Sequence, residues 1–385
     1  MDFAELDGPG MTIGLDPGAT LTALGLMSGT SLDAIDAAIV RTDGLLQVEP
    51  VAFRSIRYSP RLRGRLRSVL GATGPSPSLR AVELAMTEAH ADIVDILLKE
   101  NNVSKSNIDI IGFHGHTIDH RPDEGQTWQI GDSRDLSDAT GLPVVSAFRL
   151  ADVAAGGQGA PFAPLYHAAR AAGAPKPLAI LNVGGVANVT WLGERGTAEE
   201  PEILAFDTGP GGAMVDDWMR SRTGAPFDRG GGLANLGTVD EVAIAGLLSD
   251  GYFARVPPKS LDRNRFTFEP PPGLATADGA ATLTAFTAQA VVAACTFFPV
   301  PARHWLVTGG GRHNKTLMTM LSRALEQEVK PVEAVGWNGD ALEAEAFAYL
   351  AVRSLKGLPL SLPTTTGCAE PMTGGTLWPT PAPSG

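Results

Sequence analysis

The feature that most constrains the fold of this chain is a unit that occurs twice. In "LTALGLMSGTSLDAIDAAIV", which begins at Leu21, an apolar strand, a turn of small and hydroxyl residues and a second strand follow one another. In "PLAILNVGGVANVTWL", which begins at Pro177, the same order returns with a Gly-Gly turn. Further short strands and helices follow each start. The element order therefore predicts an α/β fold built from two similar lobes.

Apolar periodicity predicts the remaining elements. In the first half we expect one helix over 78–101 and strands over 21–27, 35–40, 47–58, 109–113, 127–130 and 144–148. In the second half, "ILAFDTGPGGAMVDDWMRSRTG" and "HWLVTGGGRHNKTLMTMLSRAL" each read as strand, glycine turn and helix, and "TLTAFTAQAVVAACTFF" reads as a helix. The last helix lies in "DALEAEAFAYLAVRSLKG", with Asn338 and Asp340 as its predicted caps.

These elements suggest four segments. We expect residues 1–20 to be an N-terminal extension, 21–165 to form the first lobe and 176–345 to form the second. Residues 346–385 would be a C-terminal helix and a tail, mostly loop after Pro363, that return toward the first lobe.

Composition excludes several classes of protein. The net charge is −12, from 30 basic and 42 acidic residues, which argues against a nucleic-acid-binding surface. The two cysteines, Cys295 and Cys368, lie far apart, so we expect a reducing cytoplasm rather than a disulfide scaffold. We find no apolar run of about 18 residues and no secretory pattern, and therefore expect no membrane span.

Three turns at predicted strand ends favour a nucleotide site. They lie at 27–33, 207–213 and 308–312, and they are rich in glycine and hydroxyl residues that let backbone N–H groups approach a polyphosphate. No Gly-x-x-x-x-Gly-Lys-Ser/Thr motif is present, and "GGGRHN" lacks the glycine spacing of a dinucleotide fingerprint. Each turn alone is equally consistent with a hairpin or a helix start, but three together favour a nucleotide cleft.

Two short segments near the N-terminus compete as the first phosphate loop. "GLDPGAT", which contains Asp16, has only Thr12-Ile13 as apolar chain before it, too little for a buried strand. Gly29-Thr30-Ser31 has a predicted strand on each side. We therefore predict the phosphate turn at 29–31, with Asp16 outside the cleft.

Three carboxylates accompany these turns. Asp207 in "FDTGPGG" ends a predicted strand, where it could act as a general base or simply hold the Gly-Pro-Gly bend as an Asx-turn. Asp33 and Asp36 follow the first turn, and either could hold Mg²⁺ through water. The structural alternatives are turn capping for Asp33 and an exposed strand position for Asp36.

The segment "GFHGHTIDHRP" contains His114, His116 and His120. His-x-His on a strand places two imidazoles on one face, which is compatible with zinc or another divalent ion and a metallohydrolase. No later set of ligands at suitable spacing supports that interpretation. A hydrogen-bonding wall for a polar ligand, or buried histidines with satisfied hydrogen bonds, are the other interpretations.

The segment "FRLADVAAGGQGAPFAPLYH" places Arg149 and Gln158 around a glycine-rich loop. Arg149 could bind a carboxylate of the ligand through two hydrogen bonds. The loop could pass close to a ligand or serve only as a connector between the lobes.

Taken together, these segments resemble the anhydro-N-acetylmuramic acid kinase family. The similarity also includes "TWQIGD", "PPKSLDRNRF", "DGAATLTAFTA" and "EAEAFAYLAVR", runs in the family's order and covers about residues 21–375. It implies two duplicated actin-like (ribonuclease H-like) lobes around a central nucleotide cleft. It also implies a cytoplasmic enzyme that uses ATP and Mg²⁺ and is often a dimer. The reaction would cleave the 1,6-anhydro ring with water and phosphorylate O6, giving N-acetylmuramic acid 6-phosphate for cell-wall recycling.

The resemblance implies roles residue by residue. Asp207 matches the catalytic base, and Asp33 would hold Mg²⁺ through water. His114, His116, Arg149 and Gln158 would bind the sugar. The ATP-binding positions would be Gly29, Thr30, Ser31, Leu32, Asp33, Ala34, Ile35, Asp36, Gly184, Gly209, Gly309, Gly310, Gly311 and Asn314.

Three positions depart from the family pattern. Ala147 replaces the usual Asp before Phe-Arg, Ala34 replaces Gly after Ser-Leu-Asp, and Gly212 replaces a common Asn. The first change removes one partner for Arg149 or shifts that role to Asp152. A kinase for another anhydro sugar such as levoglucosan, and a non-catalytic sugar- or nucleotide-binding paralogue, therefore remain alternatives.

Overall fold

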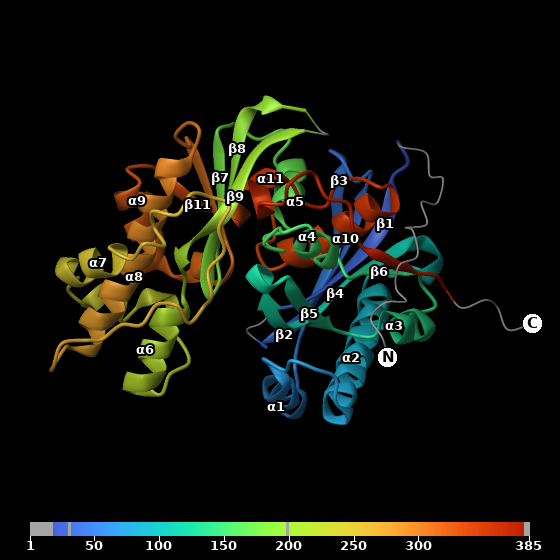
Figure 1. Ribbon diagram of the computed structural model, residues 1–385, viewed down its shortest axis with the longest axis horizontal. Helices are drawn as coiled ribbons and strands as arrows, with labels where there is room; N and C mark the ends of the chain where they lie inside the picture. Colours follow the sequence, from blue (N-terminus) through green and yellow to red (C-terminus); the bar gives the residue numbers. More distant parts are fainter. Residues whose placement is uncertain (1–17, 30–31, 198–199, 381–385) are drawn as a thin grey trace, which may run out of the picture. The chain divides into compact units, whose positions relative to one another are not determined.

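The computed structural model describes residues 18–29, 32–197 and 200–380. The chain divides into two compact units, each continuous in space (Figure 1). The first comprises Met1–Ala172 and Ala341–Gly385, and the second comprises Gly173–Asp340. The last long helix therefore belongs to the first unit although it follows the second in sequence.

The sheet of the first unit combines an antiparallel meander with parallel strands. Its order is β12-β6-β4-β1-β2-β3, and β5 pairs with β4 beyond this path. Strands β1, β2 and β3 are antiparallel, whereas β4 and β6 run parallel to β1. The strands are β1 (Leu21–Ser28), β2 (Ala34–Thr42), β3 (Val48–Arg57), β4 (Ile110–Arg121), β5 (Gln126–Ile130), β6 (Val144–Ser146) and β12 (Thr376–Trp378).

The sheet of the second unit repeats this plan. Its order is β11-β10-β7-β8-β9, in which β7, β8 and β9 are antiparallel and β10 and β11 are parallel to β7. The strands are β7 (Leu178–Val183), β8 (Val186–Gly196), β9 (Pro201–Pro210), β10 (His304–Thr308) and β11 (Val329–Pro331). Both units thus have the ribonuclease H-like strand order, and the predicted duplication of an α/β lobe is confirmed.

Helices follow the strands in both units (Figure 1). The first unit contains α1 (Pro60–Val69), α2 (Pro77–Glu100), α3 (Ser133–Thr140), α4 (Leu150–Ala154), α5 (Pro164–Arg170), α10 (Leu342–Leu355) and α11 (Pro363–Thr366). The second contains α6 (Ala213–Thr223), α7 (Glu241–Leu248), α8 (Thr276–Ala294) and α9 (Lys315–Ala324). The strands predicted at 21–27 and 35–40 and the helix predicted at 78–101 agree with the structure to within two residues at each end.

Two glycines let α10 pack closely on the first sheet. Gly25 and Gly112 are register partners on β1 and β4. A Cβ on Gly25 would lie 1.9 Å from the carbonyl oxygen of Ala344, and one on Gly112 would lie 2.1 Å from that of Phe347. Alternate residues of the same strands, such as Leu24, face the core formed with α2 on the opposite side.

Two further features differ from expectation. Asn338 and Asp340 do not cap α10, whose N-cap position is Ala341 with no side-chain hydrogen bond. Asp340 instead forms a 2.7 Å ion pair with the buried Arg312, so the prediction from the capping pattern is wrong. The tail is not entirely loop, because β12 pairs with β6.

Helix α8 lies between two hydrophobic clusters of the second unit. Contrary to our expectation that no such run exists, residues 276–297 are long and apolar enough to cross a membrane by length and composition. Most of this segment is buried inside the protein, which is the behaviour of a core helix.

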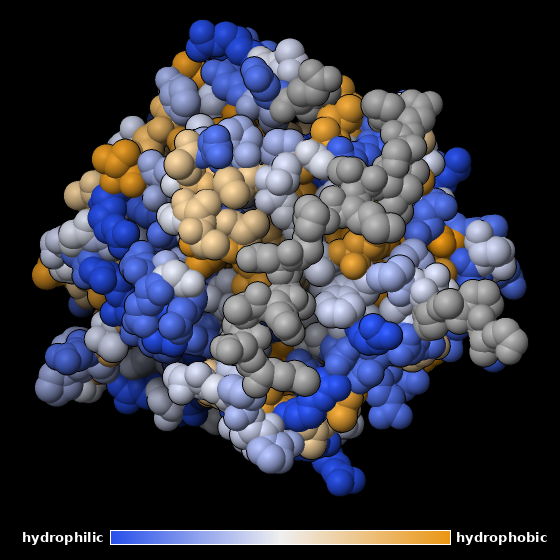
Figure 2. Space-filling view, turned by 45° about the vertical axis from the view of Figure 1, so that its right-hand side comes forward, coloured by the Kyte–Doolittle hydropathy of each residue, from blue (hydrophilic) through white to orange (hydrophobic). Residues whose placement is uncertain are grey.

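On the face displayed in Figure 2, apolar and polar residues are interspersed.

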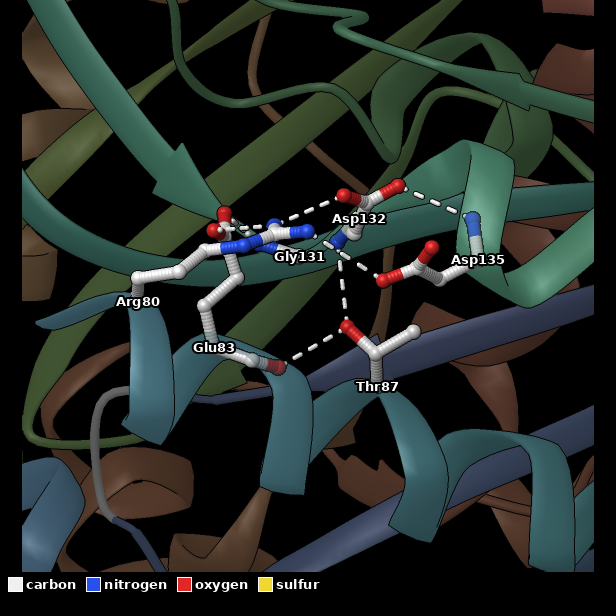
Figure 3. A network of polar contacts seen from close by, with 6 residues as sticks. All are labelled: Arg80, Glu83, Thr87, Gly131, Asp132 and Asp135. Atoms are coloured by element: carbon white, nitrogen blue, oxygen red, sulfur yellow. Dashed lines mark hydrogen bonds and ion pairs between the residues drawn. The ribbon is translucent and has the colours of Figure 1, made fainter. Parts of the chain in front are cut away.

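A polar network explains the "QIGD" part of the sequence (Figure 3). Arg80 of α2 forms ion pairs with Glu83 at 2.8 Å, Asp132 at 2.6 Å and Asp135 at 3.3 Å. Asp132 also caps α3, since its Oδ1 accepts the backbone N–H of Asp135 at 2.9 Å. A Cβ on Gly131 would lie 2.5 Å from the Phe113 ring. The motif therefore joins α2 and α3 at the end of β5.

Candidate functional site

The first predicted phosphate turn begins where β1 ends. The carbonyl of Gly29 accepts a hydrogen bond from the backbone N–H of Leu32 at 3.1 Å, and Leu32 has a φ of 59°. The carbonyl of Asp33 accepts the backbone N–H of Tyr58 at 3.1 Å. Thr30, Ser31 and Asp16 lie outside the described residues, so their predicted roles are neither supported nor contradicted.

A buried chain of hydrogen bonds lies directly behind this turn. The Oγ of Ser28, the last residue of β1, is 2.6 Å from the Tyr58 hydroxyl and 2.9 Å from Nδ1 of His116. All three side chains are buried. Tyr58 therefore contacts both ends of the turn, through its hydroxyl to Ser28 and through its backbone to Asp33.

The carboxylates after the turn differ in environment. Asp33 is exposed, and its Oδ1 forms a 2.9 Å ion pair with Arg63 of α1. Asp36 is partly buried on β2 opposite Met27, and its charge contributes to the raised pKa of Tyr58, after burial. Ile35 and Leu32 are buried in the core, and Ala34 begins β2.

His114 and His116 do not share a face of β4. Gly115 between them has a φ of 74°, and the pairing with β1 shifts register there. His114 packs on Phe347 of α10 at 4.6 Å between ring centroids, whereas His116 bonds Ser28 on the side of the sheet that faces α2. The prediction that both imidazoles lie on one face is therefore wrong, because one inserted glycine reverses the alternation.

Arg149 lies against His114. Its Nε donates to Nε2 of His114 at 3.0 Å, while Nδ1 of His114 donates to the carbonyl of Gly115 at 2.9 Å. Burial, followed by the charge of Arg149, holds the pKa of His114 well below its ordinary value. Burial also lowers the pKa of Arg149 to about 10, so the guanidinium remains charged at neutral pH. His114 is thus a neutral acceptor that orients Arg149.

The glycine-rich loop is held by Asp152. Its Oδ2 accepts the backbone N–H of Gly159 at 2.7 Å, and its Oδ1 accepts the hydroxyls of Ser361 and Thr366 at 2.5 Å each. Both carboxylate oxygens of Asp152 are therefore used in holding the loop, which is a structural role. Gln158 is tied to the same region, because its backbone N–H donates to the carbonyl of Thr366 at 2.7 Å.

In the second unit, Asp207 lies on β9 and is partly buried. Its Oδ2 accepts the backbone N–H of Leu261 at 2.8 Å, and its carbonyl accepts the Tyr252 hydroxyl at 2.5 Å. Burial raises the pKa of Asp207 from 3.8 to about 7, although the Leu261 N–H acts in the opposite direction. The carboxyl can therefore change protonation state near neutral pH, as a general base requires.

Two glycine pairs meet beside Asp207. The backbone N–H of Gly212 donates to the carbonyl of Gly184 at 2.7 Å, and that of Gly211 donates to Gly185 at 2.9 Å. A Cβ on Gly211 would lie 2.4 Å from the oxygen of Gly184. Gly209 is part of the same strand end, where β9 shifts register against β8. The Gly184-Gly185 turn and the 207–213 turn are thus neighbours.

The "TGGGRHN" turn follows β10 and packs on the end of β7. Cβ atoms on Gly309 and Gly311 would lie 2.3 Å from Oδ1 of Asn182 and 2.5 Å from the side chain of Val183, whereas a Cβ on Gly310 would meet nothing within 4 Å. The buried Arg312 donates to the carbonyl of Gly309 at 2.9 Å. Asn314 caps α9, accepting the backbone N–H of Leu317 at 2.9 Å.

Each unit thus gathers its candidate residues at one edge of its sheet. In the first unit, the C-terminal ends of the parallel strands β1 and β4 bring Ser28 opposite His116. In the second, the ends of β7, β9 and β10 bring together the glycine turns and Asp207. The carboxyl ends of parallel strands are where ligands bind in α/β sheets.

Sequence reasoning missed two residues around these turns. Tyr58 follows a predicted strand and carries no motif, and Lys259 lies in "PPKSLDRNRF", to which no role was assigned. A lysine is normally predicted to be on the surface, yet Lys259 is 3% exposed. The family-like segment around it was the only available signal.

The donor set at the first turn fits Mg²⁺ better than a transition metal. Across residues 18–29, 32–197 and 200–380, no three His, Cys, Asp or Glu side chains are grouped as a metal site. Mg²⁺ keeps several waters and commonly uses one or two carboxylates together with substrate phosphates. The exposed carboxylate of Asp33 meets that requirement, although Arg63 competes for its Oδ1.

Comparison with known proteins identifies one matching family model and several relatives of this chain. A family model described as anhydro-N-acetylmuramic acid kinase matches residues 21–380. The anhydro-N-acetylmuramic acid kinase of Rhizorhabdus wittichii is 53% identical over 361 residues, covering 92% of this chain and 98% of the relative. That of Rhodospirillum rubrum is 50% identical over 382 residues, covering 98% and 97%. A ROK family glucokinase from Streptomyces griseus, solved with glucose and AMPPNP, is only 12% identical, with a TM-score of 0.41 over 86% of this chain and 99% of its own.

Proposed function

We propose that this chain, which belongs to the anhydro-N-acetylmuramic acid kinase family and is a sugar kinase, uses ATP and water to open the anhydro ring of that sugar. O6 of the sugar would receive the γ-phosphoryl group. The products would be N-acetylmuramic acid 6-phosphate and ADP. Such a reaction would serve the recycling of cell-wall sugars.

The observation that carries the proposal is the environment of Asp207. This carboxyl has a pKa raised to about 7 by burial and lies at the strand end where the glycine turns of the second unit meet. A general base works best when its pKa is near the operating pH.

The proposed chemistry has a simple balance. Asp207 accepts a proton from water while the water oxygen bonds to the anomeric carbon, and the bond from that carbon to O6 breaks. O6 then bonds to the γ-phosphorus as the bond to the β–γ bridging oxygen of ATP breaks and ADP leaves. The proton held on Asp207 is afterwards released to solvent.

Phosphoryl transfer depends mainly on positioning and on stabilising charge. We assign the phosphates of ATP to the backbone around Gly29 and Asp33 and to the turn at Gly309–Gly311. Gly310 is exposed and its Cα faces open space, which suits close approach of a nucleotide. Mg²⁺, when bound through Asp33, would neutralise charge on the phosphates.

We assign the sugar to the region of Arg149, His114 and Gln158. Arg149 is charged and already oriented by His114, so it suits the lactyl carboxylate of muramic acid. Arg121 is less suited, because Asp119 and Glu124 already pair with it. His116 is fully buried behind the first turn, so its contribution to sugar binding would be indirect. A cytoplasmic location and a homodimer also remain proposals.

One assay tests the whole proposal. ADP release is measured with anhydro-N-acetylmuramic acid, levoglucosan and N-acetylmuramic acid side by side, and the phosphorylated product is weighed by mass spectrometry. We expect ADP only with the first sugar, and a product heavier than the sugar by one phosphoryl group and one water. ADP with levoglucosan alone would indicate the other anhydro-sugar kinase. Sugar binding without ADP would indicate a non-catalytic paralogue.

Asp207→Asn provides the matched control. It retains an oxygen that can accept the Leu261 N–H but cannot serve as the base. We expect ATP and sugar binding to persist and turnover to be lost. Normal turnover by this variant would exclude the role assigned to Asp207.

A further inference from the structure

The side chain of Lys259 is the most unusual charged group in the second unit. It is 3% exposed, and its Nζ lies 4.6 Å from the ring centroid of Tyr252 and 4.7 Å from that of Phe297. A buried ammonium is costly unless it is hydrogen-bonded or surrounded by aromatic faces. Both kinds of compensation are present here, while burial, followed by the charge of Arg255, lowers the pKa of Lys259 to about 8.

The hydrogen bonds of Lys259 join the two ends of one loop. Nζ donates to the carbonyl of Tyr252 at 3.0 Å and to that of Phe253 at 3.4 Å. The loop between 253 and 259 is therefore closed by its own lysine. A side chain without a donor would remove the Nζ hydrogen bond from both carbonyls, and the Tyr252 carbonyl would keep only the backbone N–H of Arg255, at 3.1 Å.

The same loop holds Asp207 at three points. The Tyr252 hydroxyl donates to the Asp207 carbonyl, the Asp207 N–H donates to the Lys259 carbonyl at 3.0 Å, and the Leu261 N–H donates to Asp207 Oδ2 at 2.8 Å. Two of these contacts fix the backbone of Asp207 and one fixes its carboxylate. All three come from residues 252–261, which contain the loop that Lys259 closes and the residues on each side of it.

We propose that Lys259 is a positioning residue that closes the 252–261 loop and thereby holds the carboxylate of Asp207 in its working orientation. This inference rests on the proposed function, because it gives the orientation of Asp207 a catalytic purpose. Lys259 does not touch the reacting atoms. It acts through the loop, so its loss should impair the chemical step more than the binding of ATP.

The charged and titratable groups around this loop define what a substitution would change. They are Asp207 and Tyr252 on one side, and Arg255 and Arg265, whose charges act on Lys259 and Tyr252. The Leu261 N–H lowers the pKa of Asp207 against the effect of burial. Loosening the loop weakens this hydrogen bond, so the pKa of Asp207 should rise further.

The test compares Lys259→Met with Lys259→Arg. For Lys259→Met we expect kcat to fall ~10- to 100-fold, with KM for ATP within about twofold of the native value. The acidic limb of its pH profile should move to higher pH. Lys259→Arg keeps the cation and donors and should recover much of kcat. Lys330→Met, at an exposed lysine of the same unit, is the control and should behave as the native protein.

Hydrogen exchange of the Leu261 amide gives a readout that needs no turnover. We expect Lys259→Met to exchange this amide faster while amides in β7 keep their protection. If the native protein shows no kinase activity, the proposed function fails, but this exchange experiment still tests the loop. Unchanged exchange and an unchanged pH profile in Lys259→Met would overturn the positioning role. Should that variant not fold, Lys259→Gln carries the same test.

Discussion

The Tyr58 hydroxyl lies 2.6 Å from Oγ of Ser28, and the backbone N–H of the same tyrosine lies 3.1 Å from the carbonyl of Asp33. Tyr58, the residue that follows β3, thus contacts both sides of the predicted phosphate turn. Because the side-chain contact is buried, water cannot replace it easily. The turn is therefore held from behind by a residue that carries no recognisable motif.

Tyr58→Phe removes this contact without changing the aromatic packing. The loss of one buried hydrogen bond should lower the free energy of unfolding by about 1 kcal/mol. We expect KM for ATP to rise about fivefold, because the turn loses part of its support. The measurements are steady-state kinetics and urea unfolding. Ser68→Ala, on the neighbouring helix α1, should change neither, and an unaltered KM in Tyr58→Phe would show that the turn does not depend on Tyr58.

Asp207 should set the pH dependence of the reaction. Its pKa of about 7 means that the base is increasingly protonated below neutral pH. We expect kcat/KM to fall about tenfold per pH unit below pH 7 and to level off above it. A profile that stays flat down to pH 5 would contradict Asp207 as the base.

The same shift predicts an effect on stability with a definite sign. Between pH 3.8 and about 7 the native protein holds a proton on Asp207 that the unfolded chain has released. The free energy of unfolding therefore falls as the pH rises through this range. Asp207→Asn should remove that decline and be more stable than the native protein at pH 8, with little difference near pH 4. Thermal unfolding at both pH values measures it.

Two glycines of one turn should respond differently to alanine. Gly310→Ala places its methyl group in open space, so stability should change by less than about 0.5 kcal/mol, while KM for ATP should rise ~10-fold if a nucleotide passes there. Gly311→Ala would push into Val183 and should cost about 1–3 kcal/mol of stability. Gly246→Ala, in helix α7, also meets nothing within 4 Å and is the control without an effect on ATP. Equal ATP kinetics for Gly310→Ala and Gly246→Ala would place the nucleotide elsewhere.

Asp33→Asn tests the predicted magnesium ligand. Removing the charge should raise the Mg²⁺ concentration for half-maximal activity ~10-fold, with little change in stability because Asp33 is exposed. Arg63→Gln should act in the opposite direction, since Arg63 pairs with the same carboxylate. Identical Mg²⁺ titrations for both variants would remove Asp33 from the metal site.

The duplicated fold was predictable because both lobes begin with the same strand-turn-strand pattern. Apolar runs such as that ending at Ser28 are long enough to identify a strand, and their order identifies the lobe. The glycine turns were predictable for a similar reason. A run such as Gly309–Gly311 favours a turn at which another part of the chain or a ligand comes close to the backbone.

The orientation of individual side chains was not predictable. Gly115 reverses the alternation of β4, and nothing in "GFHGHT" distinguishes that bulge from a regular strand. Asp340 has the spacing of a helix cap but pairs with Arg312, because a buried guanidinium needs partners more than α10 needs a cap. Lys259 was missed because its burial depends on three aromatic residues from separate segments.

Arg149→Lys should distinguish between sugar substrates. Lysine cannot reproduce the guanidinium that donates both to His114 and to the carbonyl of Gly159, so the cation would lose its fixed orientation. We expect KM for anhydro-N-acetylmuramic acid to rise ~10-fold or more, with KM for ATP unchanged. Arg170→Lys, on α5 of the same unit, is the matched comparison at another arginine. If Arg149 binds the lactyl carboxylate, the affinity for levoglucosan, which lacks that group, should be unaffected by Arg149→Lys. An equal loss with both sugars would instead mean that Arg149 supports the glycine-rich loop rather than recognising the carboxylate.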